Sequence, residues 1–116
     1  MVIPLQSAAV PDRGDIVWLS FEPQMGHEQA GHRPALVISP ASYNGKVGLA
    51  LLCPITNQVK GYPFEVTIPP GLGISGVVLA DRLKSLDWRA GRAVVRGKVP
   101  PEVLDQVRLC IHPLID

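Results

Sequence analysis

Residues 26–40 have the sequence GHEQAGHRPALVISP, which divides into two halves of different chemistry. The first half, up to His32, is a polar loop sequence with two glycines, two histidines and a carboxylate. The second half, residues 34–38, is a short apolar run bounded by prolines, which predicts a buried strand. Each proline ring fixes φ and removes a backbone donor, so both ends of this strand are defined. We therefore expect Arg33 to lie at the rim of a sheet or barrel, where rigid scaffolds carry functional loops.

The rest of the chain has the pattern of short strands separated by proline and glycine. Residues 41–46 predict a turn or a single helical turn, closed by the dipeptide Asn44-Gly45. Pro54 should end the strand that precedes it, and the proline and glycine residues of 69–73 mark a further turn. The alternation of charged and apolar residues at 92–98 predicts a late strand with one solvated face. The expected strands are residues 16–21, 34–38, 47–53, 64–68, 76–80 and 92–98.

One helix is expected, in the last segment of the chain. Pro101 suits the first helical turn, and Glu102 complements the positive end of the helix dipole. Pro113 should end the helix at about His112. The apolar residues recur at helical spacing on one face and are Val103, Leu104, Val107, Cys110, Ile111 and Leu114.

These elements predict a mainly β fold, an antiparallel barrel or half-barrel covered by a C-terminal α-helix. We expect residues 1–10 to form a flexible leader and residues 11–116 to form a single domain, long enough to bury a core without disulfides or metal. The apolar content of 47% excludes a disordered chain, and no run approaches the roughly 18 apolar residues of a membrane span. The start lacks the charged region of a secretory signal. Cys53 and Cys110 lie in apolar runs without a CxxC partner, which predicts reduced thiols in a cytoplasmic protein.

The charge of the chain is unevenly distributed, although the net charge is only +1. Residues 1–45 hold two arginines and four carboxylates, whereas residues 82–98 hold six basic residues and one aspartate. Such a cationic segment is expected for a partner that carries phosphates. It would equally suit the solvated faces of strands, where Lys and Arg prevent edge pairing.

Several blocks of the sequence together resemble the MazF/PemK toxin family. The blocks are PDRGDIVW at 11–18, EQAGHRPA at 28–35, SP at 39–40, KGYPFEV at 60–66 and ADRLKS at 80–85. They occur in family order from about Pro11 to Ile115, and the motif Glu-Gln-x-Gly-x-Arg-Pro is far more specific than a lone glycine pattern.

The resemblance implies an SH3-like barrel, a homodimer and a sequence-specific endoribonuclease of a type II toxin–antitoxin system. It implies cleavage of single-stranded mRNA, without metal, cofactor or ribosome, to 2′,3′-cyclic phosphate and 5′-hydroxyl ends, which inhibits translation and growth. It further implies a cognate antitoxin whose acidic, flexible C-terminal tail masks the RNA groove. The catalytic positions that it assigns are Arg33 and Thr56, with Glu28 as the associated acid.

The expected RNA contacts come from the loops beside these positions and from the cationic segment. Arg82 stands where many members of the family carry glutamine, which bears on the base read there and not on the reaction. Among the aromatic residues, Tyr62 and Phe64 flank a loop and have a better claim to meet a base than Trp18, Trp88 or Phe21, which we expect in the core. The expected RNA-binding residues are Gln29, His32, Asn57, Gln58, Lys60, Tyr62, Phe64, Arg82, Lys84 and Arg89.

The residue types suit this chemistry, because a neighbouring 2′-hydroxyl can attack phosphorus without metal if the protein stabilises the charge that develops. The planar, permanently charged guanidinium of Arg33 matches two phosphoryl oxygens, and Thr56 can donate to the same oxygens. Arginine is a poor base at neutral pH, so Glu28 or His32 is the better proton acceptor. Simpler interpretations are a surface ion pair between Arg33 and Glu28, and a plain polar turn at residues 56–58. His27 and His32 lack a third ligand, which argues against a zinc site.

Two further functions remain compatible with the sequence. A toxin of the same fold could poison DNA gyrase by protein contact and leave purified RNA uncut. A barrel that binds RNA without cleaving it would shift RNA in a salt-dependent way and release no cyclic phosphate.

Overall fold

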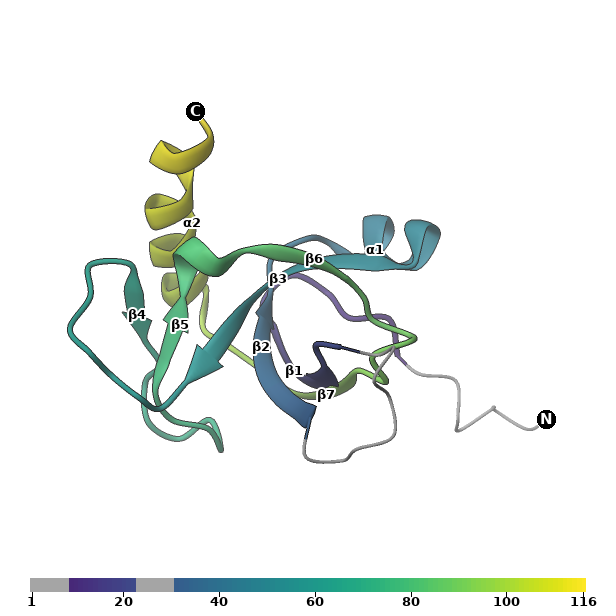
Figure 1. Ribbon diagram of the computed structural model, residues 1–116, viewed down its shortest axis with the longest axis horizontal. Coiled ribbons are helices and arrows are strands. Elements are labelled where there is room, and N and C mark those ends of the chain that lie inside the picture. The colour runs from purple at the N-terminus through teal and green to yellow at the C-terminus, as the bar shows by residue number, and fades with distance from the viewer. Residues whose placement is uncertain (1–8, 23–30) are drawn as a thin grey trace.

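The computed structural model describes residues 9–22 and 31–116. The expected leader falls almost entirely outside these ranges, as do Glu28 and Gln29. The described elements follow one another along the chain as in Figure 1. They are β1 (Asp15–Ser20), β2 (His32–Val37), α1 (Ala41–Val47), β3 (Leu49–Thr56), β4 (Glu65–Thr67), β5 (Val77–Leu79), the 3₁₀ turn η3 (Ala80–Arg82), β6 (Lys84–Asp87), β7 (Val94–Lys98) and α2 (Pro101–Ile115).

The strands form one strongly twisted antiparallel sheet in the order β4-β5-β3-β2-β1-β7, with β6 also paired to β3. Strand β3 is the centre of this arrangement. One edge pairs with β2, from Leu52 to Pro54. The other edge pairs first with β6, up to Leu52, and then with β5, from Ile55. The expected antiparallel β fold with a C-terminal helix is confirmed, because every strand pair is antiparallel and α2 closes the chain.

Strands β1, β2 and β3 contribute to a core on each face of the sheet, since neighbouring residues of a strand point to opposite sides. Ile16 and Leu36 belong to a core that α2 covers, whereas Val17 and Ala35 belong to a second core on the opposite face, closed by Trp88. Figure 1 shows α2 beside β4 and β5, at the other end of the molecule from α1. Burial on both faces explains why several strands are continuous apolar runs.

Of the two alternatives expected at residues 41–46, a turn or a single helical turn, the helical one is nearer, because these residues belong to the seven-residue helix α1, which runs to Val47. The helix ends at Gly48, which has a φ of 84° and donates its N–H to the carbonyl of Asn44. Asn44 is fully buried and therefore does not form the tip of a turn. Its side-chain amide donates to the carbonyls of Pro11 (2.7 Å) and Ser39 (2.9 Å), so it joins α1 to two loops.

Two prolines do not end their elements as predicted. Pro54 lies inside β3, between the residues paired with β6 and those paired with β5, where that edge of the strand needs no N–H donor. Pro113 lies inside α2, which continues to Ile115. The ring removes the hydrogen bond to the carbonyl of Leu109, a residue that is 73% exposed. No helix of residues 9–22 and 31–116 is long and apolar enough to cross a membrane.

Strand β6 was not expected from the sequence. Its four residues, KSLD, contain one apolar side chain, and the strand exists because Leu49 to Leu52 of β3 supply its partners. The cationic segment therefore runs from η3 through β6 to the exposed side of β7.

Candidate functional site

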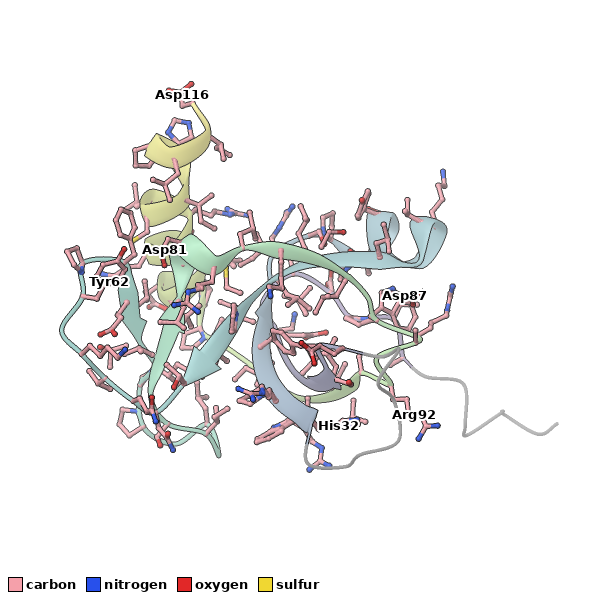
Figure 2. The ribbon with its side chains drawn as sticks, in the orientation of Figure 1. His32, Tyr62, Asp81, Asp87, Arg92 and Asp116 are labelled. Atoms are coloured by element: carbon pink, nitrogen blue, oxygen red, sulfur yellow. The ribbon has the colours of Figure 1, made fainter. Side chains whose placement is uncertain are left out.

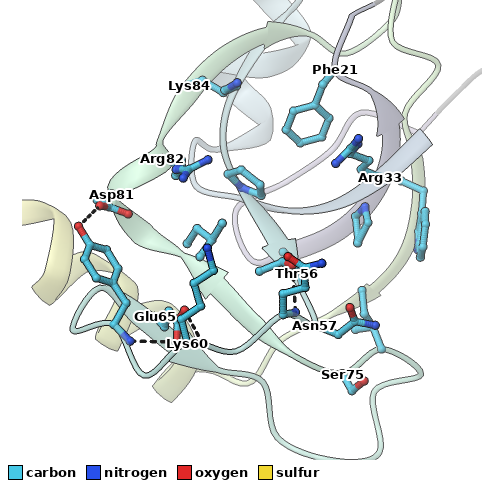
Figure 3. Close-up of a pocket in the computed structure, with 18 of the residues that line it drawn as sticks. Phe21, Arg33, Thr56, Asn57, Lys60, Glu65, Ser75, Asp81, Arg82 and Lys84 are labelled. Atoms are coloured by element: carbon cyan, nitrogen blue, oxygen red, sulfur yellow. Dashed lines mark hydrogen bonds between the residues drawn. The ribbon is translucent and has the colours of Figure 1, made fainter. Parts of the chain in front are cut away.

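A groove with a volume of about 1200 Å³ opens where β1 and β3 end and β2 begins (Figure 3). Its far wall is formed by the segment between β3 and β4 and by η3 and the start of β6. The groove brings together residues that are up to 66 positions apart in sequence, from Trp18 to Lys84.

Strand β2 positions Arg33 in the groove. In the register between β1 and β2, Arg33 is paired with Leu19 and Ala35 with Val17, so Arg33 lies on the same side of the sheet as the core that Trp88 closes. Leu19 is fully buried and Arg33 is exposed, so Arg33 marks the point where this core opens to solvent. Figure 3 shows its guanidinium directed into the hollow, and no ion pair from the described parts of the chain holds it. This is the rim position that the sequence predicts for Arg33.

Thr56 is the last residue of β3 and lies across the groove floor from Arg33 (Figure 3). Its hydroxyl oxygen accepts the backbone N–H of Gln58 at 3.1 Å, and its hydroxyl proton remains a donor. Gly76 packs directly behind Thr56. A Cβ at this glycine, which has a φ of 117°, would lie 2.8 Å from the carbonyl carbon of Thr56 and 2.9 Å from Cα of Asn57. Only glycine therefore allows the backbone before β5 to approach Thr56 this closely.

The segment between β3 and β4 is held in place by two carboxylates. Glu65 accepts the backbone N–H groups of Lys60, Gly61 and Tyr62 at 3.0 to 3.3 Å. The Tyr62 hydroxyl donates to the carboxylate of Asp81 at 2.8 Å, which ties the segment to η3 (Figure 3). The hydrogen bond and the negative charge of Asp81 raise the pKa of Tyr62 above its ordinary value, so the hydroxyl remains a donor at neutral pH.

The groove is lined by charges of both signs. Four cations face it, namely Arg33, Lys60, Arg82 and Lys84. The Lys84 ammonium lies 5.5 Å from the ring centroid of Phe21, within reach of a cation–π interaction. Among the described residues, three carboxylates also line it: Glu22, Glu65 and Asp81.

The structure brings most of the expected site residues together. Those that line the groove are Arg33, Thr56, Asn57, Gln58, Lys60, Tyr62, Arg82 and Lys84. Glu28 and Gln29 lie outside the described residues.

Three expected RNA contacts do not line the groove. His32 lies at the start of β2, away from Tyr62 and Asp81 (Figure 2), and its buried Nδ1 has no hydrogen-bond partner among the described residues. Phe64 packs against the ring of Tyr62, with 5.7 Å between the centroids. The Arg89 guanidinium lies over the indole of Trp88 at 4.5 Å.

Several groove residues were missed from the sequence. Trp88 is 2% exposed and in the core as expected, but Trp18 is 36% exposed and lines the groove, as does half-buried Phe21. Trp18 alternates with buried Val17 and Leu19 along β1, and this alternation is what would indicate that Trp18 is exposed. The uniformly apolar run at 16–19 hides the alternation in the sequence. In the sequence Asp81 and Glu65 stand out only as parts of motifs, because a hydrogen bond between distant segments leaves no local pattern. Among the described residues no group of three His, Cys, Asp or Glu side chains is placed to hold a metal ion.

The sequence of residues 12–115 matches the family described as PemK-like, MazF-like toxin of type II toxin-antitoxin system. The chain is 51% identical over 109 residues to the endoribonuclease toxin MazF of Escherichia coli strain K12, covering 94% of this chain and 97% of that protein. It is 36% identical over 110 residues to the endoribonuclease toxin ChpB of the same strain, covering 90% of this chain and 94% of that protein.

The fold also resembles those of solved structures. The crystal structure of MazF from Deinococcus radiodurans superposes with a TM-score of 0.84 and 58% identity, covering 92% of this chain and 97% of that one. The MazE–MazF structure from the same organism superposes with a TM-score of 0.83 and 52% identity, covering 92% of this chain and 96% of that one.

Proposed function

Because the chain belongs to the PemK-like, MazF-like toxins of type II toxin–antitoxin systems, we propose that the groove is the site at which it binds and cleaves single-stranded RNA. The chain is an endoribonuclease toxin, and its partners are RNA and a cognate antitoxin. The observation that carries the proposal is the placement of Arg33 and Thr56 on one groove that three further cations line.

Arg33 stabilises the negative charge that develops on the phosphoryl oxygens during cleavage. The 2′-hydroxyl of the preceding ribose gives up its proton and attacks phosphorus, and the bond to the 5′-oxygen breaks. The leaving 5′-oxygen takes a proton from solvent, so the products carry a 2′,3′-cyclic phosphate and a 5′-hydroxyl. The guanidinium fork binds two phosphoryl oxygens as they become more negative, and the Thr56 hydroxyl donates to the same group. Because Thr56 accepts the N–H of Gln58, its oxygen is held in place while its proton is still available to a phosphoryl oxygen.

The 2′-hydroxyl proton needs an acceptor that is mostly deprotonated at neutral pH, which an arginine is not. We assign this role, or the orientation of Arg33, to Glu28. His32 is the weaker candidate, because it does not line the groove. Neither a metal nor a cofactor takes part in this scheme.

The RNA lies along the cationic wall of the groove. Lys60, Arg82 and Lys84 meet phosphates, Asn57, Gln58 and Gln29 offer amide groups to bases, and Tyr62 offers an aromatic face for stacking. The substrate is mRNA, cleaved at specific sequences in the cytoplasm without the ribosome, so that translation and growth stop. A homodimer and an antitoxin with an acidic, flexible tail, which would occupy the same cationic groove, complete the assembly.

The test is incubation of the purified protein with a long RNA in EDTA, followed by mapping of the cut sites and of their end groups. We expect discrete cuts that bear cyclic phosphate in the presence of the chelator. Arg33→Ala should slow cleavage by about 10² to 10³, as expected when one donor to a developing oxyanion is removed. Arg33→Lys should recover only part of the rate, because an ammonium keeps the charge and loses the fork.

Arg96→Ala is the matched control, because it removes an exposed arginine of β7 that does not line the groove. It should cleave at the rate of the unmodified protein. Full activity in Arg33→Ala would end the proposal, and so would RNA that stays uncut, as a gyrase poison or a pure RNA-binding protein would leave it.

A further inference from the structure

The hydrogen-bonded pair of Tyr62 and Asp81 is unusual for the wall of a groove that binds a polyanion. Asp81 is exposed, lines the groove and stands next to Arg82 in η3. A carboxylate in this position repels RNA phosphates and lowers affinity for the backbone. Its presence therefore calls for a partner other than phosphate.

The other groove carboxylate for which the structure describes partners is already saturated. Both oxygens of Glu65 accept backbone N–H groups of the segment from Lys60 to Tyr62. Asp81 differs, because Oδ2 accepts the Tyr62 hydroxyl while no described residue donates to Oδ1. Within residues 9–22 and 31–116, no cation lies within ion-pair distance of Asp81. The carboxylate is thus oriented by one hydrogen bond and keeps one oxygen for a ligand, as Figure 3 shows at the edge of the hollow.

Resting on the proposed RNA-cleaving function, we propose that Asp81 is a specificity-determining residue that reads one base of the RNA through an amino group, with Tyr62 as the residue that positions it. Oδ1 accepts a hydrogen bond from N6 of adenine or N4 of cytosine. Unstacked bases of single-stranded RNA present these edges to proteins, and carboxylates are suited to accept from an exocyclic amine.

The same geometry rejects the other bases. Uracil and guanine carry an oxygen where cytosine and adenine carry the amine, and this oxygen would face the carboxylate oxygen without a proton between them. The N1–H and N2 donors of guanine would engage a carboxylate best through two oxygens, and Tyr62 already occupies Oδ2. Phosphates are held by Arg82 and Lys84 on the same wall, so the bases beside them can reach Asp81.

The test combines a residue change with a base change. The cleavage site is first mapped on a long RNA, and kcat/KM is then measured on short RNAs that contain it. In these RNAs each adenosine is replaced in turn by purine riboside and each cytidine by pyrimidin-2-one riboside, which lack the amine. With the unmodified protein, we expect loss of one amine to lower kcat/KM by about 5- to 150-fold. With Asp81→Ala, loss of the same amine should change kcat/KM by less than about 2-fold, while the effects of other positions persist.

Tyr62→Phe keeps the carboxylate and removes the hydroxyl that orients it, so the effect of the amine should be intermediate. Thr67→Ala, a change on an exposed position of β4 outside the groove, should leave the effect as in the unmodified protein. If Asp81→Ala lowers the cleavage of all RNAs by one common factor, Asp81 merely supports the segment that carries Tyr62 and the inference is wrong. The inference fails, while the proposed function stands, if the unmodified protein cuts RNA but the effect of losing each amine is the same with and without Asp81. An unmodified protein that cuts no RNA refutes the proposed function itself.

Discussion

Replacing Gly76 by alanine tests how closely the backbone before β5 must approach the end of β3. Gly76 has a φ of 117°, a conformation that costs a residue with a Cβ about 1–3 kcal/mol. The added Cβ would also lie 2.8 Å from the carbonyl carbon of Thr56 and 2.9 Å from Cα of Asn57. Carbon atoms pack at about 3.5–4.0 Å, so the two backbones must separate by about 1 Å.

Both effects lower the free energy of unfolding. Overpacking of this kind costs about 1–3 kcal/mol, so Gly76→Ala should lose about 2–6 kcal/mol in total. That is a large part of the about 5–15 kcal/mol that stabilises a typical domain. Gly73→Ala is the matched control: this glycine has a φ of 75° and nothing within 4 Å of the added Cβ, so only the conformational cost applies.

The assay is urea denaturation followed by the fluorescence of buried Trp88, together with RNA cleavage under conditions where each variant is folded. Movement of Thr56 by about 1 Å should slow cleavage by Gly76→Ala about 10²-fold, whereas Gly73→Ala should cleave at close to the normal rate. Equal unfolding free energies and equal cleavage rates for the two variants would show that the close approach to Thr56 has no energetic consequence.

Two further predictions concern groups buried away from the groove. Burial raises the pKa of the Cys53 thiol to about 12, so at pH 8 about 10⁻⁴ of the molecules carry the thiolate. Alkylation of the native protein should therefore modify half-buried Cys110, while Cys53 reacts only after unfolding, and equal labelling rates of the two thiols would contradict this expectation. Because the folded pKa is raised, the stability that comes from the neutral thiol should be lost as the pH rises from about 9 toward 12. Asn44→Ala should lower the free energy of unfolding by about 2–4 kcal/mol, because it leaves the buried carbonyls of Pro11 and Ser39 without their donor. In the same urea titration, the change Asn57→Ala at an exposed position should alter the free energy of unfolding by less than about 0.5 kcal/mol.

The parts of the fold that follow a local pattern could be predicted from the sequence. The alternation at 92–98 predicts a strand with Val94 and Arg96 on its exposed side, as β7 has them, although β7 begins at Val94 and Arg92 lies in the turn before it. The helical spacing of Val103, Val107 and Ile111 likewise identifies the face of α2 that is buried. In each case the residues of one element are enough to show which of its faces is buried, and the surface that packs against that face only has to be apolar.

Elements that depend on a distant partner could not be predicted. The four residues of β6 contain too little apolar character to indicate a strand, and their pairing with Leu49 to Leu52 creates it. Asn44-Gly45 is a strong turn dipeptide, yet the buried donors and acceptors around Asn44 favour a helix there. Local preferences of less than about 1 kcal/mol per residue give way to such contacts.

The candidate site divides in the same way. Arg33 could be predicted because the adjacent Pro34 and the apolar strand after it determine where it lies. The opposing wall was foreseen only in part, since Asp81 and Glu65 act through hydrogen bonds to the segment from Lys60 to Tyr62. No spacing within one element encodes these bonds, which form only when β4 pairs with β5 and η3 lies beside β3.

Pro54 links the fold to the groove. Its lack of an N–H suggested the end of a strand, but the chain uses it where β3 changes partner from β6 to β5. The two partners diverge at this point, and the connection between them is η3, which carries Asp81 and Arg82 to the groove. Because β3 continues for two residues beyond the proline, Thr56 reaches the groove floor between that wall and Arg33. Pro54, which the sequence alone suggests as the end of the strand, is therefore the residue at which the sheet opens to form the site.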